Sequence, residues 1–321
     1  MQSIRQKIRF TLLTSFIVTG LFSVVSGQQA PVFSQIMFDH MAINPGFAGS
    51  SDMVCLNALA KQDMIGFAGN PESAVFSAST PFRLFGISSG AGLTILTDQL
   101  GYNNNLSMNL TYAYQMNVGD GRLGIGIRGG FINAGISGME WVYPDTELSG
   151  GQDELVPQND DTGIGLDLGM GLYYKTDNLY VGGSVLNFGQ PEIQYRQNGV
   201  YQMKPHFFVM GGYRMQLANP LFEIQPSLFV QSDGKINSLN LNTNLMYNKR
   251  FWGGVSYRVA SMVTGMLGIE LFNGLRIGYS YDFATSKLIN YSTGSHELML
   301  SYCFTIKKEK VPQKYKSIRF L

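Results

Sequence analysis

Cysteine and histidine are scarce in this chain. Its 321 residues include two cysteines and three histidines, too few cysteines for a disulfide-stapled scaffold and without the paired Cys-x-x-Cys spacing of a zinc site. His40, His206 and His296 stand far apart with no matching nucleophile, which gives a Ser-His-Asp hydrolase little support. We therefore expect a protein that is not an enzyme and that binds no cofactor or metal.

Charge of one sign and long apolar runs are also scarce. Lys and Arg number 23 against 22 Asp and Glu, a formal net charge of +1, which lacks the basic excess of a nucleic-acid-binding protein. The mean hydropathy of +0.01 is far below that of a polytopic helical membrane protein. The 38 glycines, 17 tyrosines and 21 phenylalanines are typical instead of a β-barrel whose outer face meets lipid.

The first 27 residues have the pattern of a secretory signal. Three basic residues precede an apolar stretch at 10–25, and residues 25–27 offer small or tolerated side chains to signal peptidase. A transmembrane anchor is the alternative, but the stretch is near the lower length limit for a span and contains five hydroxyl side chains, Thr14, Ser15, Thr19 and Ser23 among them. We predict that residues 1–27 are removed and that the mature chain starts near Gln28.

The rest of the chain alternates apolar and polar residues almost everywhere. From 106 to 116 the even positions are Leu, Met, Leu, Tyr, Tyr and Met, whereas the odd positions are polar or small. This is a period of two over a full membrane-spanning strand. A soluble β-sandwich also alternates, but its solvent face would carry Lys and Glu. Here the polar positions are mostly Gly, Ser and Asn, which favours an enclosed lumen.

These patterns predict an all-β fold, an antiparallel up-and-down transmembrane barrel of about fourteen strands in the outer membrane. The strands are expected to begin near residues 53, 73, 87, 104, 121, 163, 178, 201, 221, 237, 250, 262, 274 and 295. With the first strand running outward, the inner turns fall at 81–84, 117–120, 176–177, 218–220, 248–249 and 273–274. Most outer connections are longer, at 62–71, 136–162, 190–199 and 285–294, although those at 232–235 and 260–261 are short.

The predicted division of the chain has four parts. They are the signal at 1–27, an N-terminal segment at 28–52, the barrel at 53–306 and a basic tail at 307–321. We expect both termini of the mature protein in the periplasm. The tail could dock a periplasmic protein or be a disordered end.

Two motifs near opposite ends of the mature chain resemble those of a known family. The opening motif is Phe33-Ser34-Gln35 followed by Asn44-Pro45-Gly46-Phe47-Ala48-Gly49, and the closing motif is Ser295-His296-Glu297-Leu298-Met299-Leu300. Both resemble signatures of the PorP/SprF family of type IX secretion system membrane proteins of the Bacteroidota. Two segments depart from that pattern: 29–32 lacks the expected acidic residue and 61–64 lacks an Arg-x-Gln-Trp form. These departures leave the subgroup and the cargo open.

The resemblance implies a non-enzymatic outer-membrane component of the type IX secretion system. Such proteins assist the delivery or surface retention of cargo with C-terminal sorting domains, including gliding adhesins in some members. The implied partners are type IX secretion components, a secreted cargo protein and outer-membrane lipid, without nucleic acid. Two alternatives stay open: a small-solute porin or transporter, and a surface-anchored adhesin partner with no secretion role.

Strand parity predicts a set of ionisable side chains that face the lumen. They are Arg128, Asp167, Arg214, Glu223, Arg258, Glu270, Arg276 and Asp282. A porin would line its channel with such groups, but the mixed signs favour a mutually neutralising network that fills and rigidifies a closed barrel.

The acidic outer connection at 136–162 is the best candidate for a partner-binding loop. Its acidic and aromatic residues are Glu140, Trp141, Tyr143, Asp145, Glu147, Asp153, Glu154, Asp160 and Asp161, with no basic residue among them. A basic or cation-bridged partner would fit this loop, and a solvated surface loop is the alternative. The spacing of its acids does not match a known Ca²⁺ loop, so no metal site is predicted.

One short motif is a false positive. Residues 124–129 read Gly-Ile-Gly-Ile-Arg-Gly, which matches the dinucleotide-binding pattern letter for letter. The glycines lie inside a period-two strand with no following helix to hold a pyrophosphate. We expect them to leave space in the lumen for larger side chains opposite.

The two cysteines form a candidate disulfide. Cys55 falls near the inner end of the first strand and Cys303 near the inner end of the last, with the same lumen-facing parity. Barrel closure makes these strands neighbours, and an oxidising envelope permits the bond. Two free thiols are the alternative if barrel shear separates the Cα atoms by more than ~7 Å.

Overall fold

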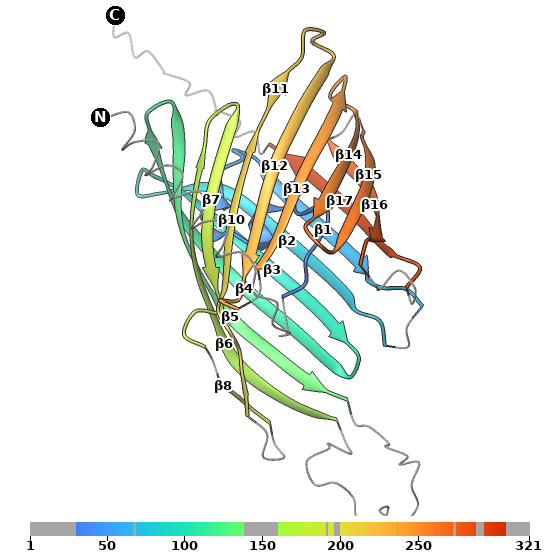
Figure 1. The fold of residues 1–321 in the computed structure, drawn as a ribbon. Coiled ribbons are helices and arrows are strands. Elements are labelled where there is room, and N and C mark those ends of the chain that lie inside the picture. The colour runs from blue at the N-terminus through green and yellow to red at the C-terminus, as the bar shows by residue number, and fades with distance from the viewer. Residues whose placement is uncertain are drawn as a thin grey trace, which may run out of the picture.

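The computed structural model describes residues 30–66, 69–137, 160–190, 192–195, 200–235, 237–271, 274–286 and 292–305. They form a closed antiparallel β-barrel of fourteen strands, which confirms the fold predicted from the alternation (Figure 1). Within these ranges, no helix is long and apolar enough to cross a membrane.

The wall strands follow one another around the barrel in chain order. The first seven are β1 (Val54–Gln62), β2 (Glu72–Leu84), β3 (Ile87–Leu100), β4 (Asn103–Val118), β5 (Gly121–Ile136), β6 (Asp161–Lys175) and β7 (Leu179–Leu186). The eighth is interrupted at Arg214 and consists of β10 (His206–Tyr213) and β11 (Met215–Gln216), which both pair with β12. The last six are β12 (Phe222–Ser232), β13 (Asn237–Tyr247), β14 (Phe251–Arg258), β15 (Met262–Glu270), β16 (Leu275–Ala284) and β17 (Ser295–Phe304).

The barrel closes where the first strand meets the last. β1 pairs antiparallel with β17 over its whole length, from Val54 opposite Phe304 to Gln62 opposite His296. Cys55 and Cys303 are register partners in this ladder. Their Cα atoms lie 4.1 Å apart and their sulfurs form a disulfide. The seam of the barrel is therefore joined covalently near one end.

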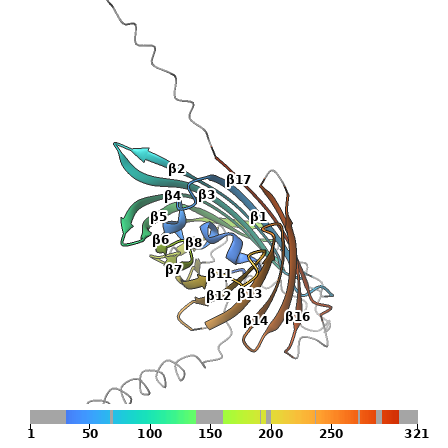
Figure 2. The ribbon, with the colours of Figure 1, turned by 90° about the horizontal axis from the view of Figure 1, so that it is seen from above.

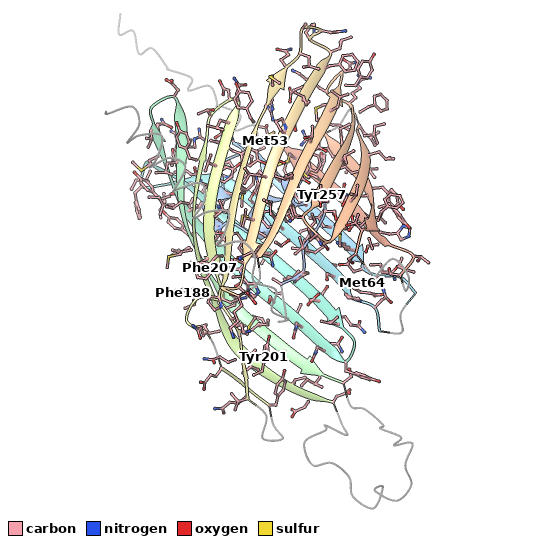
Figure 3. All side chains as sticks on the ribbon, viewed as in Figure 1. Met53, Met64, Phe188, Tyr201, Phe207 and Tyr257 are labelled. Atoms are coloured by element: carbon pink, nitrogen blue, oxygen red, sulfur yellow. A yellow bond between two sulfur atoms is a disulfide. The ribbon has the colours of Figure 1, made fainter. Side chains whose placement is uncertain are left out.

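The two rims of the barrel differ in the length of their connections. The inner rim, at the top of Figure 1, carries the tight turns between β2 and β3, β4 and β5, and β13 and β14. The outer rim carries the long connection that follows β5. Figure 3 places Met53 toward the inner rim and Met64 and Tyr201 toward the outer rim. Short turns on one side and long loops on the other are typical of an outer-membrane barrel.

The first inner turn lies farther along the chain than predicted. The prediction of a turn at 81–84 was wrong, because β2 continues to Leu84 and the turn is Phe85-Gly86. Both turn residues have positive φ, +50° and +82°, as a two-residue hairpin turn of type I′ requires. Glycine at its second position supplies that conformation at no steric cost.

The eighth strand also begins later than predicted. Residues 200–202, where it was expected to start, form β9 (Val200–Gln202), which pairs with β8 (Glu192–Gln194) in a separate two-stranded sheet. Ile193 of this hairpin is fully buried against Ile132 and Ala134 on the inner face of β5. Burial of this apolar residue holds the hairpin against the wall, and the barrel strand starts only at His206.

Side chains alternate between lipid and lumen as the period of two predicted. Outward residues such as Leu110, Ile164 and Leu267 are 68, 71 and 63% exposed, whereas their neighbours in sequence are mostly buried. The inward positions are rich in Asn, Ser and Thr. This is the arrangement of a membrane-spanning barrel with a polar interior.

The N-terminal segment, residues 30–53, lies inside the barrel (Figure 2). It contains three single-turn 3₁₀ helices, η1 (Ile36–Phe38), η2 (His40–Ala42) and η3 (Pro45–Phe47). Phe33 and Ile36 are buried in one cluster with wall residues that include Leu59, Trp252 and Met299. The main hydrophobic core of the protein is therefore the contact between this segment and the inner face of the barrel.

Candidate functional site

The N-terminal segment spans the lumen from rim to rim. At the outer rim, the backbone of Ala30 donates to His206 Nε2 at 3.1 Å and accepts from Gln231 Nε2 at 3.1 Å. At the inner rim, the Asp52 carboxylate accepts from Arg122 at the start of β5. The described part of the segment therefore runs from near the outer rim at residue 30 to the inner rim before β1 begins. The predicted periplasmic position of the mature N-terminus gains no support from this course.

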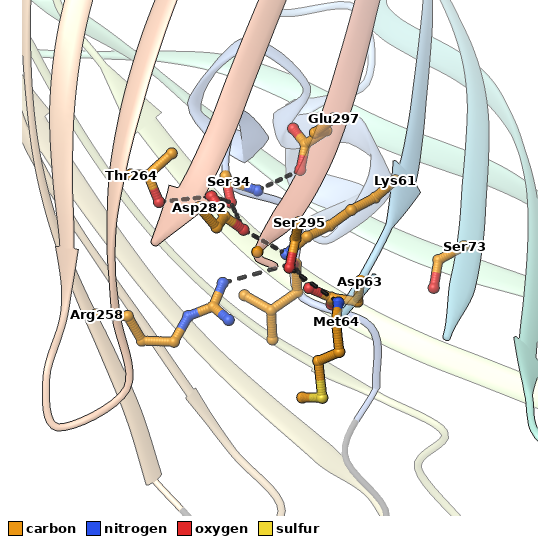
Figure 4. A network of polar contacts seen from close by, with 12 residues as sticks. Ser34, Lys61, Asp63, Met64, Ser73, Arg258, Thr264, Asp282, Ser295 and Glu297 are labelled. Atoms are coloured by element: carbon orange, nitrogen blue, oxygen red, sulfur yellow. Dashed lines mark hydrogen bonds and ion pairs between the residues drawn. The ribbon is translucent and has the colours of Figure 1, made fainter. Parts of the chain in front are cut away.

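Buried charges of β1, β14, β16 and β17 hold the outer end of the segment (Figure 4). Lys61 Nζ donates to the carbonyl oxygen of Val32 at 3.0 Å, and Arg258 donates to the same oxygen at 3.4 Å. Lys61 also forms ion pairs with Asp282 at 2.9 Å and Asp63 at 3.2 Å. A buried lysine is stable only when such partners replace its water.

The Glu297 carboxylate binds the backbone of the opening motif. Its two oxygens accept from the amides of Ser34 at 2.6 Å and Gln35 at 2.8 Å. Glu297 is 1% exposed and stands opposite Lys61 in the β1–β17 ladder. Charge-assisted hydrogen bonds of this kind are about twice as strong as neutral ones. The opening and closing motifs of the sequence therefore meet in one site.

Asp282 connects the same segment to a third part of the wall. Its carboxylate accepts from Ser34 Oγ at 2.8 and 2.9 Å and from Thr264 Oγ1 of β15 at 2.7 Å. We call Lys61, Arg258, Asp282 and Glu297 the outer latch. Its four side chains come from four strands and converge on residues 32–35, so the folded barrel is needed to assemble it.

A second polar contact holds the middle of the segment. Asp39, in the link between η1 and η2, accepts from Ser77 Oγ at 2.7 Å and Asn57 Nδ2 at 3.3 Å. Burial raises the pKa of Asp39 to about 6, although the hydrogen bond from Ser77 opposes the shift. The next residue, His40, contacts the Tyr173 hydroxyl through Nδ1 at 3.0 Å, and burial lowers its pKa to about 4.

The Asn44-Pro45-Gly46 part of the opening motif packs directly on glycines of the wall. Asn44 Nδ2 donates to the Leu172 carbonyl at 2.9 Å while its Oδ1 accepts from Gly46 N and caps η3. A Cβ added at Gly124 would lie 2.0 Å from the Gly46 oxygen, and one at Gly126 would lie 2.2 Å from the Pro45 carbonyl carbon. The space left by these glycines is therefore filled by the segment's backbone, and the expectation of larger side chains opposite was wrong.

The end of the opening motif is packed as closely. Ala48 is fully buried, and a Cβ added at Gly90 of β3 would lie 2.0 Å from its carbonyl oxygen. Phe47 packs edge to face on Tyr173, with ring centroids 5.2 Å apart. Gly49 has a φ of +73°, a conformation in which glycine is favoured. Each of these residues has a packing role at the inner half of the lumen.

The closing motif divides between the two faces of β17. Ser295 Oγ accepts from the Met64 amide at 3.1 Å. His296 points outward and contacts the Tyr279 hydroxyl at 2.6 Å, whereas Glu297 points inward to the outer latch. Alternation along the strand separates the two side chains, so His296 and Glu297 do not act as a pair.

Six of the eight charges predicted to face the lumen neutralise one another in three pairs. Salt bridges join Arg128 to Asp167 at 2.9 Å, Arg214 to Glu223 at 3.0 Å and Arg276 to Glu270 at 2.7 Å. Asp282 pairs with Lys61, as described above. Arg258 donates to Asn240 Oδ1 at 2.8 Å and to Val32. These contacts agree with a neutralising network.

Lys61 and Glu297 were missing from the predicted set. Both were available from parity, since Lys61 lies six residues after Cys55 and Glu297 lies six residues before Cys303. An even spacing along a strand places the side chains on the same face. The signal was therefore present, but nothing in the linear sequence indicated that residues 32–35 would meet these charges.

Most of the predicted partner-binding loop lies outside the described residues. Glu140, Trp141, Tyr143, Asp145, Glu147, Asp153 and Glu154 belong to that part, as does the basic tail from residue 307. Asp160 and Asp161 are described, and Asp161 is 3% exposed on the inner face of β6. Its Oδ1 accepts from the Thr162 amide at 2.8 Å. Asp161 therefore belongs to the lumen wall.

A small chamber remains in the lumen beside the docked segment. Its volume is about 130 Å³, and Phe33 and Ile36 of the segment lie against it together with Arg128, Asp167 and His206 of the wall. Such a volume admits a few waters or one small molecule. The protein is therefore a closed barrel whose lumen is filled by the N-terminal segment, residues 30–53, which we call the plug.

Comparisons with known proteins found distant structural similarities. A search of curated proteins found no match. Among solved structures, the outer membrane protein Omp33 of Acinetobacter baumannii is 8% identical, with a TM-score of 0.45 over 78% of this chain and 98% of that one. The toluene transporter TbuX of Ralstonia pickettii is 14% identical, with a TM-score of 0.44 over 88% and 96%. The monoaromatic hydrocarbon channel CymD is 14% identical, with a TM-score of 0.49 over 88% and 95%.

One protein family covers nearly all of the barrel and the plug. The family described as type IX secretion system membrane protein PorP/SprF matches residues 25–302. That range includes the whole N-terminal segment, the outer latch and the closing motif. The chain therefore belongs to the PorP/SprF family of type IX secretion system membrane proteins.

Proposed function

We propose that this protein is a non-enzymatic outer-membrane component that assists type IX delivery or surface retention of cargo with C-terminal sorting domains. The observation that carries the proposal is the docked segment. Residues 30–53 run through the lumen and are bound by side chains from at least four wall strands. A barrel closed in this way suits a platform for other proteins better than an open passage.

The acidic connection after β5 is the proposed contact for the secreted partner. Its flanking strands β5 and β6 end and begin at the outer rim, and the sequence of residues 136–162 carries the acidic residues Glu140, Asp145, Glu147, Asp153, Glu154, Asp160 and Asp161 with no lysine, arginine or histidine among them. A basic or cation-bridged surface would be attracted by such a loop. The basic tail after residue 306 is the proposed contact for secretion components on the periplasmic side.

Co-purification tests the platform directly. A tag placed after Leu321, mild detergent extraction of outer membranes and mass spectrometry should recover type IX components or one large secreted protein with a C-terminal sorting domain. A tagged outer-membrane barrel of similar abundance serves as the control. Recovery of the folded barrel alone, with normal heat-modifiable migration, contradicts the proposal.

A small-solute porin is the second candidate, and the small chamber at the outer end of the lumen is what favours it. Planar bilayers separate the two functions. A plugged and neutralised lumen should give little ion conductance, whereas steady ohmic steps from the wild-type protein would establish a porin. A bacterial strain from which the protein has been deleted should lose surface display of the co-purified cargo but take up small solutes as the wild-type strain does.

A further inference from the structure

A row of polar side chains faces outward along the outer rim. Its members are His296, Gln62, Glu72, Gln99, Asn104 and Thr162. Neighbours in this outer polar row are register partners across β17, β1, β2, β3 and β4, and Gly135 stands between Asn104 and Thr162. Gln62 Nε2 donates to Glu72 Oε1 at 2.8 Å. The row is therefore continuous over seven adjacent strands.

The row borders a hollow in the outer wall of the barrel. The hollow has a volume of about 740 Å³ and is lined by the outer polar row, by Ala60, Ala74, Leu106 and Leu298, and by the polar residues Thr97, Asn133, Ser137 and Asp160. Residues of the lumen-facing parity also border it, and among them Lys61 is buried with its ammonium group paired to Asp282 and Asp63. The apolar residues lie one outward position closer to the centre of each strand. The hollow is thus amphipathic: its floor combines these apolar side chains with Thr97 and Asn133 of the same row, and its rim is the outer polar row.

The position of the hollow coincides with the edge of the lipid-facing surface. The next outward row toward the inner rim is wholly apolar and includes Phe76, Ile95, Met108 and Leu300. On the opposite wall, most outward residues near the outer rim are apolar, namely Phe207, Val230, Leu239, Tyr257 and Val263, and only Ser232 and Asn237 among the described residues of β12 and β13 add polar side chains at its edge (Figure 3 labels Phe207 and Tyr257). The hollow therefore lies at the level where acyl chains end and headgroups begin, on one side of the barrel.

The chemistry of the rim indicates which headgroup fits. The outer polar row carries three amides, a hydroxyl, an imidazole and a single carboxylate, with neither lysine nor arginine among its members. A phosphate headgroup would require basic side chains, whereas amides donate to and accept from sugar hydroxyls. The outward ring of Tyr281 packs on His296 at one end of the row, with ring centroids 4.9 Å apart.

We propose that this hollow is a binding site for the saccharide headgroup of an outer-leaflet glycolipid. The amides of Gln62, Gln99 and Asn104 bind sugar hydroxyls, while Ala60 and Ala74 leave room for the junction of sugar and acyl chains. The site lies on the lipid side of the wall, so a membrane-anchored ligand reaches it by lateral diffusion. Glycolipid bound there would determine which lipids surround the barrel in the outer leaflet, independently of any cargo.

Native mass spectrometry of the full chain, extracted from outer membranes in mild detergent, tests the site. The wild-type protein should retain glycolipid through delipidation steps that remove phospholipid. Ala60→Trp with Ala74→Trp fills the floor with two indole rings and should lower the retained glycolipid about tenfold or more. Ala58→Trp with Ala78→Trp is the matched control, since these outward alanines lie on the same two strands within the lipid-facing rows.

Heat-modifiable migration verifies that each variant folds. A second variant, Gln99→Leu with Asn104→Leu, removes the amides without filling the hollow and should also reduce retention. Equal glycolipid on the floor variant and its control overturns the proposal. So does a wild-type protein that retains only phospholipid, no lipid, or a protein partner in the hollow.

Discussion

Glu297 of the last strand accepts hydrogen bonds from the backbone amides of Ser34 and Gln35, which precede it by 263 and 262 residues. The same strand is joined to β1 by the Cys55–Cys303 disulfide. The C-terminal strand β17 therefore both closes the barrel and binds the plug. Docking of the N-terminal segment is complete only when the last strand is in place.

Loss of the Glu297 carboxylate should loosen the outer end of the segment. In Glu297→Gln, one acceptor oxygen becomes an amide donor that faces a backbone N–H. A hydrogen bond to a charged group contributes about 1.5–3 kcal/mol, so amide exchange at residues 34 and 35 should accelerate by about tenfold or more. Hydrogen–deuterium exchange with mass spectrometry measures this. Glu72→Gln, on the outward face, is the control, and unchanged protection in Glu297→Gln would falsify the latch.

Wall glycines should control the inner half of the segment. Gly126→Ala places a methyl group against the Pro45 carbonyl, a backbone contact that a side-chain rotation cannot relieve. Displacement of residues 44–48 should raise ion conductance in planar bilayers and open the segment to protease. Gly265→Ala, at a position with no heavy atom within 4 Å, should behave as wild type. A tight, non-conducting Gly126→Ala protein would show that this contact does not hold the plug.

The seam disulfide should stabilise the barrel against heat. The bond closes a sequence separation of 248 residues, and its removal in Cys55→Ser with Cys303→Ser should cost about 2–4 kcal/mol of unfolding free energy. The double variant should therefore lose heat-modifiable migration at a lower temperature than wild type. A thiol assay under denaturing, non-reducing conditions gives an independent check, since two free thiols per wild-type chain would exclude the bond.

His40 and Asp39 should make the stability of the docked segment depend on pH in opposite directions. Burial lowers the pKa of His40 from 6.5 to about 4, so its contribution to docking is present above pH 6.5 and is lost as the pH falls through about 4. Burial raises the pKa of Asp39 from 3.8 to about 6, so its contribution is present below pH 3.8 and is lost as the pH rises through about 6.

Single variants separate these two contributions. In His40→Gln, amide protection factors around residues 39–40 should fall as the pH rises from about 4 to about 6, because Asp39 then loses its proton with no opposing change at residue 40. In Asp39→Asn the protection factors should instead fall as the pH is lowered across the same interval, because the opposing change at Asp39 is absent and His40 disfavours docking at low pH. Wild type should show the flattest profile. The same pH slope in both variants would contradict this assignment.

Strand positions were largely available from the sequence, and the reason is local. A strand that separates lipid from a polar lumen must alternate its side chains, so the period of two carries the boundaries. Predicted starts at 87, 121, 237, 262 and 295 agree with the observed strands. The errors fall where local signals compete: Pro81 suggested a turn that Phe85-Gly86 supplies, and residues 200–202 alternate but pair with β8.

The position of the plug was decided only by the tertiary structure. Residues 30–53 have no strand period, and their contacts with Lys61, Gly126 and Glu297 span distances along the chain over which a linear pattern carries no register. Gly124 and Gly126 look like ordinary strand glycines until another backbone lies against them. The sequence by itself determined a barrel with a charged, neutralised lumen, because alternation and residue type suffice for that. The docking of residues 30–53 in the lumen was decided only by the tertiary structure, because the side chains that bind them come from separate strands and meet only when the barrel closes.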